Sequence, residues 1–359
     1  MVHGLWPIGI LIYVLGTFLG GLGANLQRKA FVDEQESNED DGEDMTPAIQ
    51  RKVFVCGLIL FVCSGIFMAI ALNFSSQTSL APLLLFLLVF NALFAYLINN
   101  ERIHWLGLDG LAIVIVVIGV SMALVGAPKG VVNYTISQAT ALIQTSGFIT
   151  FFTCVPVAIV VIWLAKYYIE YNKLAQEDYS AKIFLYISYG ALAGSFGGLN
   201  ITLTKFLFAT ITGEGQHSGI KAVICAPLVW IISVFLITTY VMQILVAIEG
   251  LEHASAIIVM SAHSVVEEIT ASMGGIFCFG DARDFKQWQW LLFFFGNLLA
   301  IGGVIVLTHS RLKHLNEDRI IPIHESESLT SSFRSRSGIS KETSNYVRME
   351  SNASPPPTI

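Results

Sequence analysis

Two adjacent carboxylates, Glu267 and Glu268, lie inside a long apolar stretch of the sequence. If that stretch is a transmembrane helix, each ionised carboxylate costs about 2.5–3.5 kcal/mol to insert, so it needs a cation, a polar partner, water or a proton to offset it. Adjacent side chains point about 100° apart on a helix. We therefore expect one carboxylate to face a pathway through the protein and the other a helix–helix interface. Both are candidate metal ligands, since carboxylates bind hard cations such as Mg²⁺.

Other polar residues in apolar stretches could complete this site. His263 precedes Glu267 by one helical turn on the same face, and if it also binds the metal, softer divalent ions become better candidates than Mg²⁺. Both the carboxylate pair and His263 could instead form a structural, hydrogen-bonded cluster. Amide and hydroxyl residues can bind a partly hydrated cation or simply hydrogen-bond across helices. Those that we assign to the pathway are Asn200, Thr204, Asn91 and Gln243.

Three charged residues near the predicted helix ends have structural interpretations. Lys205 is predicted to snorkel to a membrane interface, with pairing to a carboxylate as the alternative. Glu101 and Asp281 are predicted to be end-caps or gates. Glycines spaced four residues apart predict close packing of one helix face against a neighbour. They are Gly190, Gly194 and Gly198. The sequence has no nucleophile–base motif and no phosphate-binding glycine loop, so we expect neither an enzyme nor a cofactor.

The composition identifies the class of protein that holds these residues. Of the 359 residues, 54% are hydrophobic and 13% are charged, whereas a soluble domain has about a quarter charged residues. The formal net charge of −6 offers no basic surface for phosphates, which excludes nucleic acid as a partner. The chain is therefore predicted to be an all-α polytopic membrane protein.

Nine apolar stretches are long enough to cross a hydrocarbon layer of roughly 30 Å, which takes about 20 helical residues. The predicted transmembrane helices cover residues 7–25, 53–73, 80–98, 106–125, 148–167, 183–208, 223–247, 254–279 and 288–307. Lys and Arg residues near their ends divide ten to four between the two sides. Because positive charge favours the cytosolic side, this division predicts an N-terminus outside and a C-terminus in the cytosol.

The segments around the helices are polar. The transmembrane domain is predicted to span residues 1–310. A cytosolic loop at residues 26–52 contains eight acidic residues, which is typical of a solvated linker, although a weak sensor of divalent cations is the alternative. Residues 311–359 are predicted to form a disordered cytosolic tail. Among the glycosylation sequons, Asn133 falls in a loop placed outside and is the candidate.

The two halves of the chain, about residues 7–127 and 148–309, resemble each other. Gly20-Gly21-Leu22 in the first half corresponds to Gly197-Gly198-Leu199 in the second, and a basic residue follows the second glycine by seven positions in both. Because the halves point in opposite directions in this topology, we predict two inverted repeats. Inverted repeats are a feature of secondary transporters, which bind their substrate near the membrane midplane.

A set of short motifs runs through most of residues 7–309. They are Pro82, Glu101, Leu106-Gly107, Gly119, Ala127-Pro128, Gly197-Gly198, Lys205 and Gln243. Together they resemble the NIPA-type magnesium transporters of the drug/metabolite transporter superfamily. This resemblance implies nine or so helices, an N-out and C-in topology and transport of magnesium or related divalent cations. The chain departs from the family pattern at Ser261, where the family has Pro, at Asp281, where it has Glu, and at the Glu267–Glu268 pair.

The first hypothesis is a transporter of divalent cations, Mg²⁺ above all, with a midplane site built around Glu267 or Glu268. The alternatives are a secondary transporter of a small organic metabolite, such as a nucleotide sugar, and a non-transporting membrane scaffold. The expected partners are the metal cation, the lipid bilayer and a second copy of the chain in a homodimer. The membrane is predicted to be the plasma membrane or an endosomal membrane.

Overall fold

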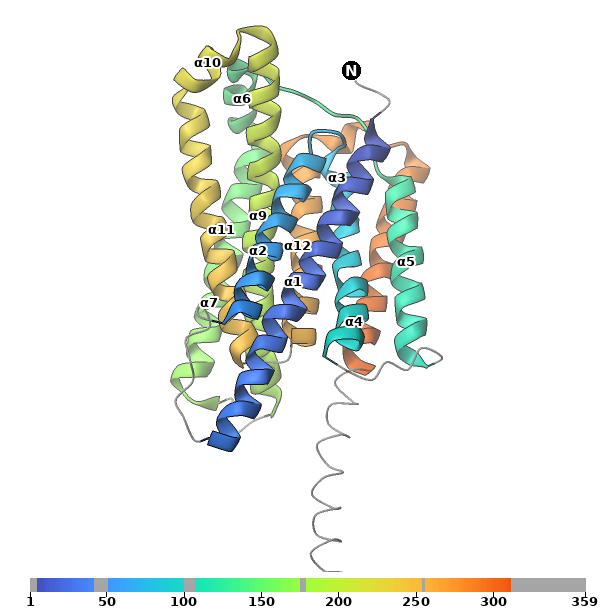
Figure 1. Ribbon diagram of the computed structural model, residues 1–359. Coiled ribbons are helices and arrows are strands. Elements are labelled where there is room, and N and C mark those ends of the chain that lie inside the picture. Colours follow the sequence, from blue (N-terminus) through green and yellow to red (C-terminus); the bar gives the residue numbers. More distant parts are fainter. Residues whose placement is uncertain (1–4, 42–50, 100–106, 175–178, 254–255, 311–359) are drawn as a thin grey trace, which may run out of the picture. The chain divides into compact units, whose positions relative to one another are not determined.

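The computed structural model describes residues 5–41, 51–99, 107–174, 179–253 and 256–310. Every regular element within these ranges is a helix (Figure 1), so the predicted all-α class is confirmed. The tail from Arg311, residues 42–50 of the acidic loop and Glu101 lie outside the described residues.

The helices follow one another with short connections. In chain order they are α1 (Trp6–Asp41), α2 (Lys52–Ala71), α3 (Gln77–Leu80), the 3₁₀-helix η2 (Ala81–Leu85), α4 (Phe86–Ile98), α5 (Leu108–Gly126), α6 (Ile136–Ile143), α7 (Ser146–Tyr171), α9 (Tyr179–His217), α10 (Ile220–Cys225), α11 (Pro227–His253), α12 (Ala256–Cys278), the 3₁₀-helix η3 (Asp281–Asp284) and the last helix, Gln287–Ser310.

Among the described residues, seven helical segments are long and apolar enough to cross a membrane. Large apolar side chains such as Val161 and Trp163 of α7 and Phe235 of α11 are exposed, and exposed apolar surface on this scale needs lipid or a partner to cover it. The chain is therefore a multi-pass membrane protein. Two of the nine predicted spans, α9 and α12, are not among the seven, although both exceed 20 residues in length.

The first helix is longer than predicted. α1 continues to Asp41 instead of ending at Asn25, so the prediction of a loop over residues 26–52 is wrong for its first part. The residues after Asn25 include Arg, Lys, Gln and Glu, which are good helix formers. This extension also packs on α2, where the rings of Phe31 and Phe54 lie 5.4 Å apart in an edge-to-face arrangement.

Pro82 interrupts the third predicted span. A proline has no backbone N–H and cannot continue an α-helical ladder, and the chain forms η2 between α3 and α4 at this point. Residues 75–85 are all buried. Irregular backbone is tolerated at membrane depth only where protein covers it or a cavity adjoins it, so this segment belongs to the interior of the protein.

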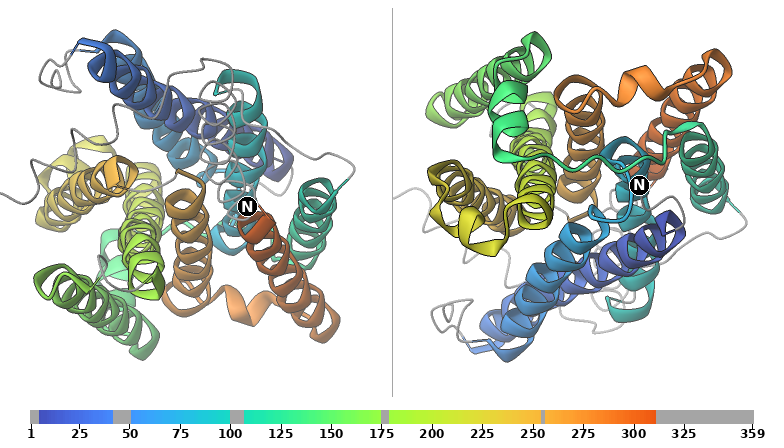
Figure 2. Two further views of the ribbon diagram at one scale, coloured as in Figure 1. Left: turned by 90° about the horizontal axis from the view of Figure 1, so that it is seen from below. Right: turned by 90° about the horizontal axis from the view of Figure 1, so that it is seen from above.

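α9 and α12 lie side by side in both end views (Figure 2). A Cβ atom at Gly190 or Gly194 would collide with the backbone oxygen of Val259 or His263 on α12, and one at Gly198 would collide with a side chain there. The two helices therefore approach to backbone contact along the glycine face, as the four-residue spacing predicts.

Gly194→Ala should lower the midpoint of thermal unfolding in detergent, because overpacking an interior costs roughly 1–3 kcal/mol. The matched control is Gly215→Ala on the same helix, since no atom of the described residues, apart from its own helical turn, lies within 4 Å of the position of its Cβ. Equal unfolding midpoints for the two variants would contradict the close packing of α9 on α12.

Two apolar clusters lie around this helix pair. One contains Leu84 and Val116 and draws mainly on α1, α2, α3, η2, α4 and α5, with further members from α9, α11, α12 and the last helix. The other contains Phe148, Phe206 and Ile232 and draws on α6, α7, α9, α10, α11 and the end of α12. The polar residues in the middle of α9 and α12, among them Asn200, Thr202 and Glu267, are therefore buried inside the protein. The inverted repeat stays a prediction.

Candidate functional site

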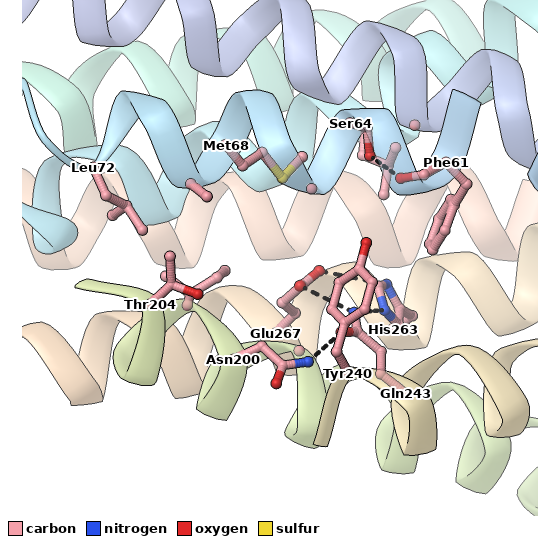
Figure 3. Close-up of a pocket in the computed structure, with 16 residues that line it drawn as sticks. Phe61, Ser64, Met68, Leu72, Asn200, Thr204, Tyr240, Gln243, His263 and Glu267 are labelled. Carbon is pink, nitrogen blue, oxygen red and sulfur yellow. Dashed lines mark hydrogen bonds and ion pairs between the residues drawn. The ribbon is translucent and has the colours of Figure 1, made fainter. Parts of the chain in front are cut away.

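A cavity of about 70 Å³ lies between α2, α9, α11 and α12 (Figure 3). Such a volume holds on the order of a few water molecules. Five of the seven predicted pathway residues line it, from three different helices. They are Asn200, Thr204, Gln243, His263 and Glu267. The structure thus brings most of the predicted site together, with Glu267 at the midpoint of α12.

Hydrogen bonds connect these polar side chains across three helices (Figure 3). Nδ2 of Asn200 on α9 donates to Oε1 of Gln243 on α11 at 2.6 Å, and the hydroxyl of Thr239 donates to Oδ1 of Asn200. Nε2 of Gln243 lies 3.2 Å from Nε2 of His263 and 3.5 Å from Oε1 of Glu267, both on α12. The network therefore directs the amide nitrogen of Gln243 towards the carboxylate.

The second oxygen of Glu267 faces a histidine. Its Oε2 lies 3.5 Å from Nδ1 of His263, and this ring nitrogen has no hydrogen-bond partner among the described residues. Both side chains are buried, with 6% of Glu267 and 2% of His263 exposed. A buried polar atom without a partner is costly. A water molecule or a cation beside Oε2 would therefore stabilise this arrangement.

Gly197 makes room for the carboxylate. A Cβ atom at this position would lie 2.7 Å from Nε2 of Gln243 and 2.7 Å from Cδ of Glu267, closer than side-chain atoms can approach. Glycine therefore allows α9 to pass next to both groups. The sequence marked Gly197 only as part of a repeated glycine pair, so its place in the site was not predicted.

Glu268 and Asn91 do not line the cavity. Glu268 is 1% exposed, and its Oε1 accepts a hydrogen bond from Oγ of Ser272 at 3.0 Å, one turn further along α12. Asn91 accepts a hydrogen bond from Nδ2 of Asn25 at 2.6 Å, which joins α4 to α1. The structure therefore does not place Glu268 beside Glu267 as a second ligand for one ion.

Lys205 does not snorkel, so that prediction is wrong. α9 continues to His217 instead of ending at Phe208, which places Lys205 inside the protein, where it is 5% exposed. Its Nζ donates to the backbone oxygens of Leu72, at 2.6 Å, and Ser75, at 3.2 Å, just beyond the last turn of α2. A lysine is favourable there because the last carbonyls of a helix lack intrahelical donors.

Polar contacts also hold the short helix α3. The backbone N–H and the hydroxyl of Thr78 donate to Oδ2 of Asp281, at 3.3 and 2.6 Å. Nε2 of Gln77 donates to Oγ1 of Thr202 on α9, at 2.9 Å, and to the backbone oxygen of Ala271 on α12, at 2.7 Å. Asp281, a predicted end-cap or gate, thus binds α3.

Two aromatic residues of the cavity wall, Phe61 of α2 and Tyr240 of α11, were not predicted. Tyr240 lies three residues before Gln243 on the same helical face, and this spacing is a signal that could have identified it. Phe61 has no comparable signal, because an aromatic residue in an apolar helix faces lipid as readily as a cavity. Phe61 also lines a smaller void of about 10 Å³ next to Gln27 and Met260.

The cavity could hold a cation that keeps part of its water. Within the described part of the chain, no three His, Cys, Asp or Glu side chains are gathered closely enough to hold a metal ion. Mg²⁺ retains several waters and needs only one or two carboxylates. The cavity provides the carboxylate of Glu267, the hydroxyls of Ser64 and Thr204 and space for water.

The connection between α5 and α6 carries the glycosylation candidate. Asn133 is exposed in a non-helical segment, and its glycosylation stays a prediction. The next residue, Tyr134, is partly buried, and its backbone N–H donates to Ala209 at 3.0 Å. Burial and the nearby charge of Asp281 raise the pKa of the Tyr134 phenol to about 12, so this phenol stays protonated at physiological pH.

A family model described as magnesium transporter NIPA matches residues 5–313 of the chain. The chain belongs to the NIPA magnesium transporter family. The comparisons with curated proteins and with solved structures gave no match.

The NIPA match extends from the start of α1 to just beyond the last helix, so it includes every cavity residue. It confirms the resemblance found in the sequence. Since this is a family of transporters, the chain is not an enzyme.

Proposed function

We propose that this NIPA family member carries Mg²⁺ across a bilayer and that Glu267 binds the ion in the cavity between α2, α9, α11 and α12. The observation that carries this proposal is one buried carboxylate, at the midpoint of α12, facing a cavity of a few water molecules in volume. A carboxylate at such a depth is costly and is a functional-site candidate by default.

The chemistry of the cavity suits a partly hydrated Mg²⁺. This ion prefers oxygen ligands and releases its waters reluctantly, so one carboxylate and several waters are a sufficient ligand set. The orientation of Gln243 by Asn200 keeps an amide N–H next to one carboxylate oxygen of Glu267. The other oxygen is then available to the ion or to one of its waters.

The size of the cavity argues against an organic metabolite. Its volume is about 70 Å³, whereas pockets for small molecules have roughly 300–1,000 Å³. The phosphates of a nucleotide sugar would also need a cation in the pathway. The buried Lys205 is engaged with the carbonyls of Leu72 and Ser75. The third hypothesis, a scaffold without transport, does not explain why a carboxylate is buried next to a cavity.

We infer that α9 and α12 cross the membrane together with the seven apolar segments. α9 and α12 run alongside the seven apolar segments (Figure 1). The buried polar side chains of these two helices face each other and the cavity instead of lipid. Nine crossings place the two ends of the helical domain on opposite sides, and the positive charges favour an N-terminus outside. The choice between the plasma and an endosomal membrane and the homodimer stay predictions.

His263→Ala should change the ranking among divalent metals more than it changes Mg²⁺ uptake. Imidazole suits ions such as Zn²⁺ and Ni²⁺, whereas Mg²⁺ prefers oxygen, and Nδ1 of His263 lies next to Glu267. The measurement is uptake of Mg²⁺, Mn²⁺, Co²⁺, Ni²⁺ and Zn²⁺ by the reconstituted variant. The control is Ser264→Ala, which removes a buried hydroxyl outside the cavity. An unchanged ranking would exclude His263 from the ion's surroundings.

The proposed function is tested with purified protein in liposomes that contain a Mg²⁺-sensitive dye. We expect saturable Mg²⁺ uptake that protein-free liposomes lack, and no uptake of labelled nucleotide sugars. The proposal would be refuted if the liposomes accumulate a nucleotide sugar and show no flux of divalent cations under a membrane potential of either sign.

A further inference from the structure

Lys205 lies at one end of the cavity and binds the segment that follows α2. The residue before it, Thr204, lines the cavity, and so does Leu72, whose backbone oxygen accepts a hydrogen bond from the Lys205 ammonium. Leu72 and Thr204 lie together at one end of the cavity, while Phe61 and His263 lie at the other (Figure 3). The buried lysine therefore holds the cavity wall at the end formed by Leu72 and Thr204.

The segment of residues 72–78, which we call the cover segment, lies next to that end. Its residues from Ser75 on are fully buried, and a Cβ at Gly9, near the start of α1, would touch Phe74 and Ser75. α3 lies at the same end of the helices as the start of α1 (Figure 1). The cover segment therefore stands between the cavity and this end of the protein.

Leu72 packs in the apolar core, whereas the residues from Ser75 to Thr78 are held by side-chain and backbone hydrogen bonds. Lys205 binds the carbonyls of Leu72 and Ser75, Thr78 binds Asp281, and Gln77 binds α9 and α12. Hydrogen bonds of this kind can be exchanged for others, whereas a packed apolar core resists rearrangement. From Ser75 to Thr78 the cover segment is thus attached by exchangeable contacts.

Asp281, which binds Thr78 of the cover segment, is a second candidate partner for Lys205. The ammonium of Lys205 carries three donors and uses two carbonyls of the cover segment. The carboxylate of Asp281 also interacts electrostatically with it. If the cover segment moves away, Lys205 loses both carbonyls. A buried ammonium needs a replacement partner, and Asp281 provides one with the opposite charge.

We propose that the cover segment is a gate at this end of the cavity and that Lys205 is its latch. In the closed state the ammonium binds the carbonyls of Leu72 and Ser75, and in the open state it pairs with Asp281. A cation that arrives next to these carbonyls repels the ammonium and favours the open state. This inference rests on the proposed function, because a gate matters only if the cavity is a transport site.

The reporter is the variant Thr204→Cys, and the test measures how fast its thiol reacts with a membrane-impermeant reagent that is applied to each side of the membrane in turn. Labelling of the parent chain, which has five cysteines, is subtracted. Lys205→Met keeps the length of the side chain and removes the charge. In this background we expect labelling from the side of α3 to accelerate about tenfold or more, because a minor open state of a few per cent becomes the major one.

A matched control and a second variant keep the inference testable. Thr210→Val removes a hydroxyl that donates to the carbonyl of Phe206 on its own helix, so it should leave the labelling rate of the reporter unchanged. Asp281→Asn keeps an acceptor for Thr78 and removes the charge that receives Lys205, so it should slow labelling below that of the reporter alone. If Lys205→Met does not fold, the Asp281→Asn result decides.

A static helix cap would give a different pattern. In that case Lys205→Met would lower the midpoint of thermal unfolding without changing the labelling rate, and Asp281→Asn would leave the rate unchanged. Either unchanged rate would overturn the latch. Labelling requires no transported ion, so the latch can fail while Mg²⁺ uptake stands, and Mg²⁺ uptake can fail while the latch stands.

Discussion

Glu267→Gln is expected to reduce Mg²⁺ uptake in liposomes by at least about tenfold while the protein still folds and inserts. Two unit charges 4 Å apart attract each other by about 4 kcal/mol at an effective dielectric constant near 20, and each 1.4 kcal/mol is a factor of about ten in affinity. Gln keeps the shape of the side chain and its hydrogen bond with Gln243. It removes the carboxylate charge that faces the cavity.

Glu268→Gln is the matched control, since it makes the same substitution at the next position of α12. Glu268 is buried away from the cavity and accepts a hydrogen bond from Ser272, which the amide oxygen of Gln can also accept. Uptake should therefore stay near that of the parent. If both variants transport Mg²⁺ and competing divalent ions like the parent, the pair is a structural cluster and an organic substrate becomes the first hypothesis.

Gly197→Ala should reduce Mg²⁺ uptake with little loss of stability. The added methyl group would lie 2.7 Å from Nε2 of Gln243 and from Cδ of Glu267, so these side chains must move and the carboxylate leaves its position. Displacing a binding group by about 1 Å can cost on the order of a hundredfold in rate. The measurement is initial uptake rate at several Mg²⁺ concentrations, together with the midpoint of thermal unfolding.

Two variants on the same helix separate this effect from loss of packing. Gly194→Ala meets backbone atoms of α12 and should mainly lower stability. Gly215→Ala meets nothing within 4 Å in the described part of the chain beyond its own helical turn, so it should change neither property. If Gly197→Ala transports Mg²⁺ like Gly215→Ala, the position of Glu267 does not control uptake.

The long apolar stretches of the sequence predict the all-helical class. The polar residues within them predict which side chains gather at the candidate site, because burying polar groups in apolar helices is costly. The sequence failed at helix ends. The apolar pattern stops at Asn25 and Phe208, but α1 continues to Asp41 and α9 to His217. Polar residues that form helices well continue both elements without an apolar signal. The misplaced end of α9 is also the reason why Lys205 was expected at an interface.

Which side chains face the cavity depends on how the helices pack, and the sequence of a single helix does not show this packing. The spacing of Glu267 and Glu268 requires them to point in different directions, but it does not say which direction faces the cavity. That choice follows from the packing of α9 and α11 on α12, which places Gly197 and Gln243 next to Glu267. The hydrogen bond between Asn200 and Gln243 also joins two helices and has no signature in either segment.

The role of Glu267 is tested most directly by locating a divalent cation in the cavity. Crystals of the parent protein and of Glu267→Gln, grown with Mn²⁺ in place of Mg²⁺, would be measured at the manganese absorption edge. We expect an anomalous peak in the cavity of the parent, from an ion bound to Glu267 directly at about 2 Å or through one water. This peak should be absent from Glu267→Gln. No peak in the parent at saturating Mn²⁺, or an equal peak in both proteins, would contradict the assignment of Glu267 as the ion's ligand.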